Sequence, residues 1–227
     1  KFNLIDIKTA DFAKLKSKFM RLGINFKNFQ PVSAAEISYY QGKNQPEDDA
    51  ILIRFQSPKA HQPLWGEQHI SLIYRKADQQ LLGFTRMIAD TQGLPPVKHQ
   101  TALDSAIKWL KTISPELLPQ KYGATPQLTP LKTNERMAFG SGHHLSDQIQ
   151  LHWIASHTEE LTQNGQKQTI HGMKVKFFLL PLNLWAWVIV DANGMVQTFE
   201  KNISWNMKKI QRETQMWLHD RWLEQHI

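Results

Sequence analysis

The sequence contains no cysteine. This absence excludes disulfide bonds, thiolate metal sites and cysteine nucleophiles together. The sequence also has no apolar run of about 18 residues, the length that indicates a membrane-spanning helix. The longest apolar stretch, over 177–190, is interrupted by Pro181 and Asn183 and is typical of two buried strands joined by a bend. We therefore expect no membrane span within this chain.

Compositional signs of disorder are also scarce. Glycine and proline number 11 each in 227 residues, while 41% of the residues are hydrophobic and 21% are charged. This balance is typical of a globular chain with a sizeable core. The chain begins at Lys1 without Met or an apolar leader, which predicts a trimmed or mature form whose targeting segment is missing.

Positive charge exceeds negative charge, and the formal net charge is +7. Much of the excess lies in residues 8–22, where the spacing predicts a helix that faces the core. Its apolar stripe consists of Phe12, Leu15, Phe19 and Leu22. The predicted helix also carries Lys14, Lys18 and Arg21. These residues form either a contact surface for an anionic polymer or lipid, or an ordinary solvated face.

The stretch over 185–205 reads WAWVIVDANGMVQTFEKNISW, and the DANG at its centre predicts a turn. Asn193-Gly194 between β-branched and aromatic runs is a strong hairpin signal, because both residue types tolerate a positive φ. A helical calcium loop would need further oxygen ligands downstream. Met195 and Val196 supply none, so we expect a hairpin corner.

A similar pattern occurs earlier in the chain, at a constant offset of 115 residues. The offset pairs Ile73 with Val188, Tyr74 with Ile189, Ala77 with Ala192, Leu81 with Val196, Phe84 with Phe199, Arg86 with Lys201 and Ile88 with Ile203. A helical pattern ending in Trp-Leu follows each copy, at 109–110 and at 217–218. The sequence therefore predicts two related halves, 1–119 and 120–227.

The other patterns predict an α+β fold in which each half is an antiparallel sheet packed against helices. In the first half, the predicted elements are a short helix over 31–41, a strand over 50–55, a hairpin over 68–88 and a helix over 100–113. A linker over 114–130 follows. The second half is predicted to have strands over 147–159 and 168–180 with a turn at 163–166, and a closing helix over 206–224.

Three segments carry a resemblance to a known family: VIVDANGMV over 188–196, IYRKADQQLLGF over 73–84, and TALDSAIKWLKTISPELLP over 101–119. They resemble PepSY-type repeat proteins of bacterial envelopes, which combine a helix with strands that end in an Asp-Ala-x-x-Gly turn. The first copy departs from that pattern at Lys76, Asp78 and Gln79. The resemblance implies a cystatin-like fold and an exported or membrane-tethered binding module, with no catalytic residues to transfer.

Histidines are the one concentrated set of chemically active side chains: His143, His144, His152, His157 and His171. A zinc site needs three or four convergent ligands. His152 and His157 are five residues apart, so a regular strand would point them to opposite faces. A metal-assisted hydrolase that uses this segment is the alternative interpretation. The sequence contains no Gly-x-Ser-x-Gly elbow and no phosphate-binding loop.

The sequence has eight tryptophans, and Trp185 and Trp187 share a face of their predicted strand. They either wedge helices against the sheet or line, with Trp222, an aromatic groove for a peptide, a glycan or a partner protein. We expect a non-enzymatic protein without a cofactor, located in the cell envelope or outside the cell as a secreted protein or a lipoprotein. Its expected partner is another protein or an envelope polymer. A nucleic-acid partner is not favoured, because no strand interleaves aromatic and basic residues.

Overall fold

The computed structural model describes residues 1–121 and 124–227. The chain forms two compact units. Unit 1 comprises residues 1–88 and 203–227, and unit 2 comprises residues 89–202. Residues 122–123, which belong to the predicted linker over 114–130, lie outside the described residues.

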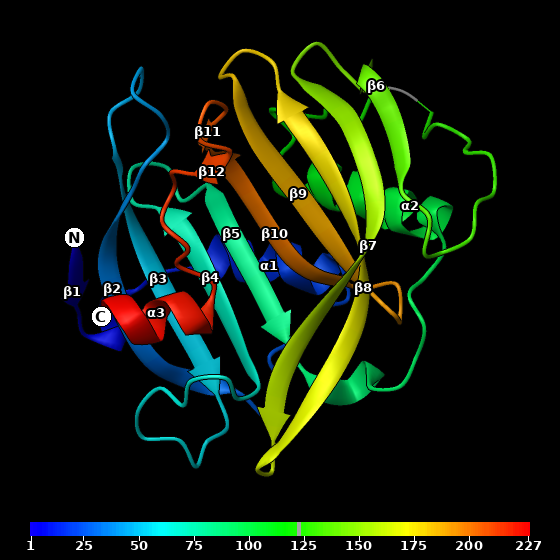
Figure 1. Cartoon of the computed structure of the whole chain (residues 1–227). Coiled ribbons are helices and arrows are strands. Elements are labelled where there is room, and N and C mark those ends of the chain that lie inside the picture. The colour runs from blue at the N-terminus through cyan, green and yellow to red at the C-terminus, as the bar shows by residue number, and fades with distance from the viewer. Residues whose placement is uncertain (122–123) are drawn as a thin grey trace. The chain divides into compact units, whose positions relative to one another are not determined.

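Unit 1 is built on five antiparallel strands in sequential order (Figure 1): β1 (Phe2–Leu4), β2 (Gln30–Tyr39), β3 (Asp48–Gln56), β4 (His69–Arg75) and β5 (Leu81–Met87). The 3-10 helix η1 (Ile7–Thr9) and the helix α1 (Ala13–Arg21) connect β1 to β2. After residue 203 the chain adds a small ribbon of β11 (Trp205–Asn206) and β12 (Gln211–Arg212), and then the helix α3 (Asp220–His226).

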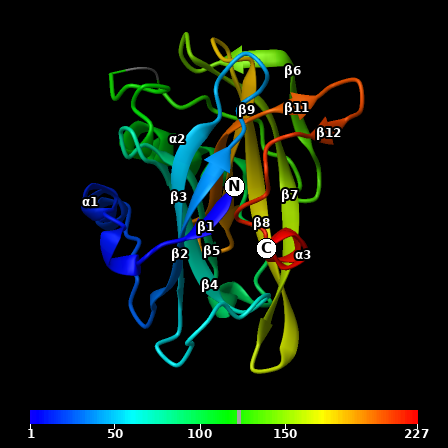
Figure 2. The same ribbon diagram turned by 90° about the vertical axis from the view of Figure 1, so that its left-hand side faces the viewer.

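The two faces of the unit 1 sheet are covered by different segments, as Figure 2 shows for α1 and α3. On one face, Phe19 of α1 packs against Phe84 of β5, with ring centroids 5.1 Å apart. On the other face, the segment before α3 approaches so closely that a Cβ on Gly83 would lie 2.9 Å from the Leu218 side chain. The sheet is therefore buried from both sides over much of its area.

Unit 2 contains the strands β6 (Met137–His144), β7 (Ile149–Gln163), β8 (Gln166–Leu179), β9 (Leu184–Asp191) and nearly all of β10 (Val196–Ile203). They are arranged in the order β10-β9-β8-β7-β6. The 3-10 helix η2 (Ala89–Thr91) and the helix α2 (His99–Ile113) precede them, and α2 packs against β8 and β9. Trp109 of α2 is fully buried, with its ring 5.7 Å from that of Phe199.

Several predicted elements are confirmed. The stripe of α1 buries Leu15 and Phe19. The buried face of α2 contains Leu103, Ala106, Ile107, Leu110 and Ile113, as its spacing predicts. Asn164 and Gly165, with φ of 52° and 77°, form the turn between β7 and β8. This conformation is the one that makes Asn-Gly a hairpin signal.

DANG is also confirmed as a hairpin corner, between β9 and β10. The Asp191 carboxylate accepts hydrogen bonds from the backbone N–H groups of Asn193 (2.8 Å) and Met195 (3.0 Å). Gly194 takes a φ of +82°. In the β4–β5 turn the residue at the predicted 115-residue offset is Gln79, and it also has a positive φ, of 58°. The two turns therefore share a left-handed position, although only one has glycine there.

The predicted α+β class, with two halves that each pack against helices, is wrong. Antiparallel strands dominate the described residues, and the α-helices in 1–121 and 124–227 are α1, α2 and α3, of 9, 15 and 7 residues. The prediction of related halves over 1–119 and 120–227 rests on sequence similarity and stays a prediction.

Two predicted helices account for much of this error. Residues 31–41 belong mainly to the strand β2, where Ile37 and Tyr39 are buried at a spacing of two. Residues 206–224 form β11, β12 and an irregular segment before the short α3. Thr214 Oγ1 donates to the Tyr40 carbonyl (2.7 Å), and Trp217 Nε1 donates to the Ser38 carbonyl (3.0 Å). These bonds tie the segment to the end of β2 and override its helical pattern.

No helix within residues 1–121 and 124–227 is long and apolar enough to span a membrane.

The shared left-handed position predicts that the two turns respond differently to substitution. Gly194→Ala should lower the free energy of unfolding by about 1 kcal/mol, because a Cβ disfavours this conformation. Gln79→Gly should leave it unchanged or raise it by a few tenths of a kcal/mol, because relief of strain offsets the added freedom of the unfolded chain. Urea unfolding of both variants tests this, and a larger loss from Gln79→Gly than from Gly194→Ala would contradict it.

Candidate functional site

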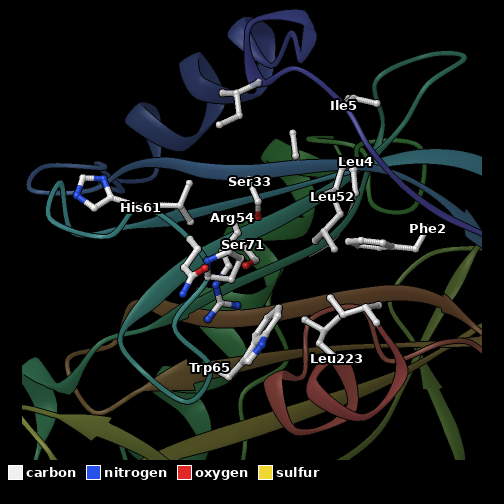
Figure 3. Close-up of a pocket in the computed structure, with 17 residues that line it drawn as sticks. Phe2, Leu4, Ile5, Ser33, Leu52, Arg54, His61, Trp65, Ser71 and Leu223 are labelled. Carbon is white, nitrogen blue, oxygen red and sulfur yellow. The ribbon is translucent and has the colours of Figure 1, made fainter.

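A cavity in unit 1 has a volume of about 460 Å³ and is lined mostly by apolar side chains. Phe2 and Leu4 of β1 line it from one direction, and Leu223 and Ile227 from α3 and the chain end line it from another. Trp65, from the loop between β3 and β4, completes the wall (Figure 3). Ligand sites in proteins are typically concave, mostly apolar and about 300–1,000 Å³ in volume.

The register of the sheet explains the floor of this cavity. Ser33 of β2 lies opposite Arg54 of β3, and Arg54 lies opposite Ser71 of β4. In the neighbouring row, Ala35 lies opposite Leu52. Directly paired residues project to the same face of a sheet, so small side chains on β2 leave space above Leu52 and Arg54. All five residues line the cavity.

Arg54 is the one charged residue of this floor, and its side chain is only 4% exposed. Its guanidinium donates to both carboxylate oxygens of Asp220, at 2.6 and 2.7 Å, in a bidentate pair. It also donates to the Leu64 carbonyl (3.1 Å) and to Gln56 Oε1 (3.1 Å). The indole of Trp65 lies against the guanidinium, with the ring centroid 4.8 Å from Cζ. The positive charge of Arg54 is therefore neutralised within the protein.

Asp220 begins α3 and connects that helix to the cavity wall. Its carboxylate accepts a hydrogen bond from the Gly66 backbone N–H at 2.8 Å, in addition to the bonds from Arg54. Burial by itself would raise the pKa of Asp220. The hydrogen bond from Arg54, the charges of His69 and Arg54, and the Gly66 N–H together outweigh burial and lower the pKa. Asp220 therefore stays ionised and paired.

Gln56 fixes the loop that carries Trp65. Its side chain is 1% exposed and accepts a hydrogen bond from the Leu64 backbone N–H at 2.9 Å. It donates to the carbonyls of Leu64 (3.0 Å) and Gln68 (3.2 Å). The loop, β3 and α3 thus meet at one buried polar cluster, which we call the Arg54 cluster: Arg54, Gln56 and Asp220. The cluster satisfies its own polar groups and leaves a cavity whose lining is mostly apolar, with Ser33, Ser71, His61 and Gln62 as its other polar residues.

The predicted aromatic groove residues are divided between the units. Trp185 and Trp187 lie on β9 of unit 2, and Trp222 lies on α3 of unit 1. Trp222 stacks on His226 with ring centroids 4.2 Å apart and meets Trp217 edge-on at 5.0 Å. Its role in a groove is a prediction that stays untested.

Trp185 and Trp187 belong to a cluster that the sequence alone did not reveal. Lys176 lies over the Trp185 ring (4.7 Å to the centroid) and Lys174 over the Trp187 ring (4.2 Å). Both lysines also approach Trp153 of β7, at 5.4 and 5.6 Å. Basic and aromatic residues therefore interleave across three strands. The expectation that a nucleic-acid partner is not favoured stays a prediction.

The five histidines are spread over three strands of unit 2. His143 and His144 end β6, His152 and His157 lie on β7, and His171 lies on β8. His152 meets Trp185 edge-on at 4.9 Å. His157 Nε2 is 2.8 Å from Glu159 Oε1, and His144 Nε2 is 3.1 Å from Gln150 Nε2. Among residues 1–121 and 124–227, no three His, Asp or Glu side chains stand together as a metal site would require.

The basic residues of the first helix, Lys14, Lys18 and Arg21, lie on α1, where Lys14 and Arg21 are exposed and Lys18 is half-buried. Contact of this helix with an anionic surface stays a prediction.

Comparison of the chain with protein-family models, with curated proteins and with solved structures found no match in any of the three. The resemblance to PepSY proteins stays a prediction from short motifs.

Removal of the Asp220 charge should destabilise unit 1 strongly. Asp220→Asn leaves Arg54 buried without its counter-charge, and breaking a buried pair in this way costs about 3 kcal/mol or more. Asp49→Asn is the matched control: Asp49 pairs with Lys1 at 3.0 Å, but its side chain is 63% exposed. Exposed pairs contribute about 1 kcal/mol or less. Urea unfolding measures the loss of unfolding free energy in each variant. Equal losses in the two variants would contradict a buried pair between Arg54 and Asp220.

The depressed pKa of Asp220 also predicts how stability depends on pH. A carboxyl group whose pKa is lower in the folded state stabilises the folded state when it is ionised. This contribution is fully present above the ordinary value of 3.8 and is lost as the pH falls through the lower folded pKa. The stability difference between the native chain and Asp220→Asn should therefore shrink as acid is added. A constant difference down to about pH 2 would contradict the pairing.

Proposed function

We propose that this chain is a non-enzymatic binding protein that holds an uncharged apolar group, such as one aliphatic chain, in the cavity of unit 1. The observation that carries the proposal is the combination of a mostly apolar lining with a buried charge pair that is already neutralised. Each methylene transferred from water into such a site contributes about 0.8 kcal/mol. A short aliphatic chain therefore gains enough free energy to bind without any ionic contact.

The neutral floor favours an uncharged ligand over a fatty acid whose carboxylate enters the cavity. Every nitrogen of the Arg54 guanidinium already donates to Gln56, Asp220 or Leu64. An incoming carboxylate would have to displace Asp220, which is held by both Arg54 and the Gly66 N–H. Burial of an unpaired carboxylate is strongly unfavourable. A neutral chain avoids this penalty and contacts Leu52 and the apolar walls.

The rim of the cavity extends the apolar character to the surface. Leu4 lines the cavity and is 72% exposed, and Ile227 lines it and is 47% exposed. Exposed apolar residues that adjoin a cavity are typical of sites that bind a ligand or partner. If the protein is located in the cell envelope, as the resemblance to PepSY proteins implies, the ligand is the aliphatic part of an envelope component. Location in the envelope is part of the proposal.

A filled cavity should abolish this binding. Ser33 lies in the floor row beside Arg54, so the larger side chain of Ser33→Leu would occupy ligand space. We expect at least about tenfold weaker binding of N-phenyl-1-naphthylamine, an uncharged apolar fluorophore, which corresponds to about 1.4 kcal/mol. Fluorescence titration measures the affinity, and thermal unfolding checks that the variant folds.

The matched control is Ser17→Leu, which adds the same side chain on the exposed surface of α1. It should bind the fluorophore as the native chain does. Native affinity in Ser33→Leu, or an equal loss in both variants, would show that the fluorophore binds elsewhere and would overturn the proposal.

A further inference from the structure

One face of the unit 2 sheet carries an ordered set of cations and indole rings. On β8, Lys174 and Lys176 are two residues apart and therefore project to the same face. Trp153 of β7 lies opposite Lys176, which in turn lies opposite Trp187 of β9. The side chains of Val175 and Phe177, which alternate with the lysines, are fully buried. The lysines and tryptophans thus form one continuous patch on the other side of the strands.

The indole rings hold the cations in place. Lys174 lies 4.2 Å from the Trp187 centroid, Lys176 lies 4.7 Å from the Trp185 centroid, and Arg136 lies 4.7 Å from the Trp153 centroid. Cations within about 6 Å of a ring centroid are attracted by the negative face of the ring. The flexible lysine side chains are therefore ordered before any ligand arrives, which reduces the entropy that binding would lose.

Positive charges are crowded within this patch. Burial and then the nearby charge of Arg136 lower the pKa of Lys176. Burial and then the charge of Lys176 lower the pKa of His152, whose ring meets Trp185. Like charges held this close raise the free energy of the unliganded patch, and an anionic group placed between them would relieve the repulsion.

We propose that this patch, which consists of Arg136, Trp153, Lys174, Lys176 and Trp185, docks an extended acidic segment of a partner protein. Trp187 is itself buried, at 6% exposed, and supports Lys174 from below. Lys174 and Lys176 are two positions apart on the strand, a distance of about 7 Å. Acidic residues at alternate positions of an extended peptide have the same spacing and place their carboxylates on one face. Tryptophan and arginine are also the residues most enriched at the energetic centres of protein interfaces.

A single-stranded nucleic acid fits the patch less well. Proteins that bind single strands stack bases on open aromatic faces. Here Trp153 has three of the chain's own cations within 5.6 Å of its ring centroid, and Trp185 and Trp187 each have a lysine over the ring. The geometry therefore offers fixed positive charges rather than platforms for bases. This inference concerns unit 2 and is independent of the apolar cavity in unit 1.

The test is a calorimetric titration of the full chain with a synthetic peptide of alternating glutamate and threonine. The matched peptide replaces each glutamate with glutamine, and an oligothymidine of similar length probes nucleic acid. We expect the acidic peptide to bind, the glutamine peptide not to bind, and the affinity to fall as salt increases. The indole N–H signals of Trp153 and Trp185 should shift in NMR spectra, whereas that of Trp109, buried against Phe199, should not.

Substitution of lysines distinguishes binding at this patch from non-specific attraction of the peptide to the positively charged chain. Lys174→Gln with Lys176→Gln should weaken peptide binding at least tenfold. Lys108→Gln with Lys167→Gln removes the same charge from exposed positions of α2 and β8 in unit 2 and should change it less than twofold. Equal weakening by both pairs, no peptide binding, or tighter binding of oligothymidine than of the peptide would overturn the proposal.

Discussion

The bidentate pair between Arg54 and Asp220 is the interaction on which the architecture of unit 1 depends. It joins β3 to the first residue of α3, although 166 residues separate the partners in the chain. The Arg54 guanidinium also donates a hydrogen bond to the Leu64 carbonyl, and the Asp220 carboxylate also accepts one from the Gly66 N–H. One buried polar contact therefore fixes the loop, the helix and the strand that surround the cavity. Such a pair need not add net stability. Removal of either partner is nevertheless strongly destabilising, because the other partner would remain as a buried charge without a counter-charge.

The apolar cavity follows from how this polar contact is placed. Ser33 and Ala35 are short, so the strand β2 leaves room above the floor, while Trp65 and Leu223 supply walls at the level of the charge pair. Every nitrogen of the Arg54 guanidinium donates a hydrogen bond within the protein, and Asp220 neutralises its charge. The cavity therefore contains a guanidinium and yet presents little net charge to a ligand. The patch in unit 2 has the opposite character. Its cations rest on indole rings, and burial, followed by neighbouring positive charges, lowers the pKa values of Lys176 and His152.

Local signals in the sequence predicted those parts of the fold that depend on local chemistry. Asn164-Gly165 and DANG predicted hairpin corners because their backbone requirements are met within a few residues. The stripe of α2 predicted its buried face because the spacing of apolar residues is itself helical. The short helix over 31–41 was wrong because Ala34 and Ala35, good helix formers, lie in a strand whose character comes from pairing with β3. The predicted closing helix over 206–224 was wrong for a similar reason, because Thr214 and Trp217 form hydrogen bonds with the end of β2 and do not continue a helix.

The candidate sites depended almost entirely on contacts that are remote in sequence. Trp185 and Trp187 were recognised as sharing a face, but the lysines that cover them belong to β8 and are brought there by strand register. Nothing in the sequence near Arg54 points to Asp220, so the cavity was missed. A hydrophobic strand interrupted by a single arginine, as in AILIRF over 50–55, is the one local signal that a buried counter-charge was needed.

Binding of an apolar chain in the cavity of unit 1 is tested most sharply by an NMR titration of the methyl-labelled chain with a neutral ten-carbon alcohol. We expect the methyl signals of Leu52 and Leu223, which line the cavity, to shift and to show contacts to the aliphatic chain. Leu103, buried in unit 2, should be unaffected. Shifts spread evenly over the buried leucines, or no contact at Leu52 and Leu223, would contradict an apolar site built on the Arg54 cluster.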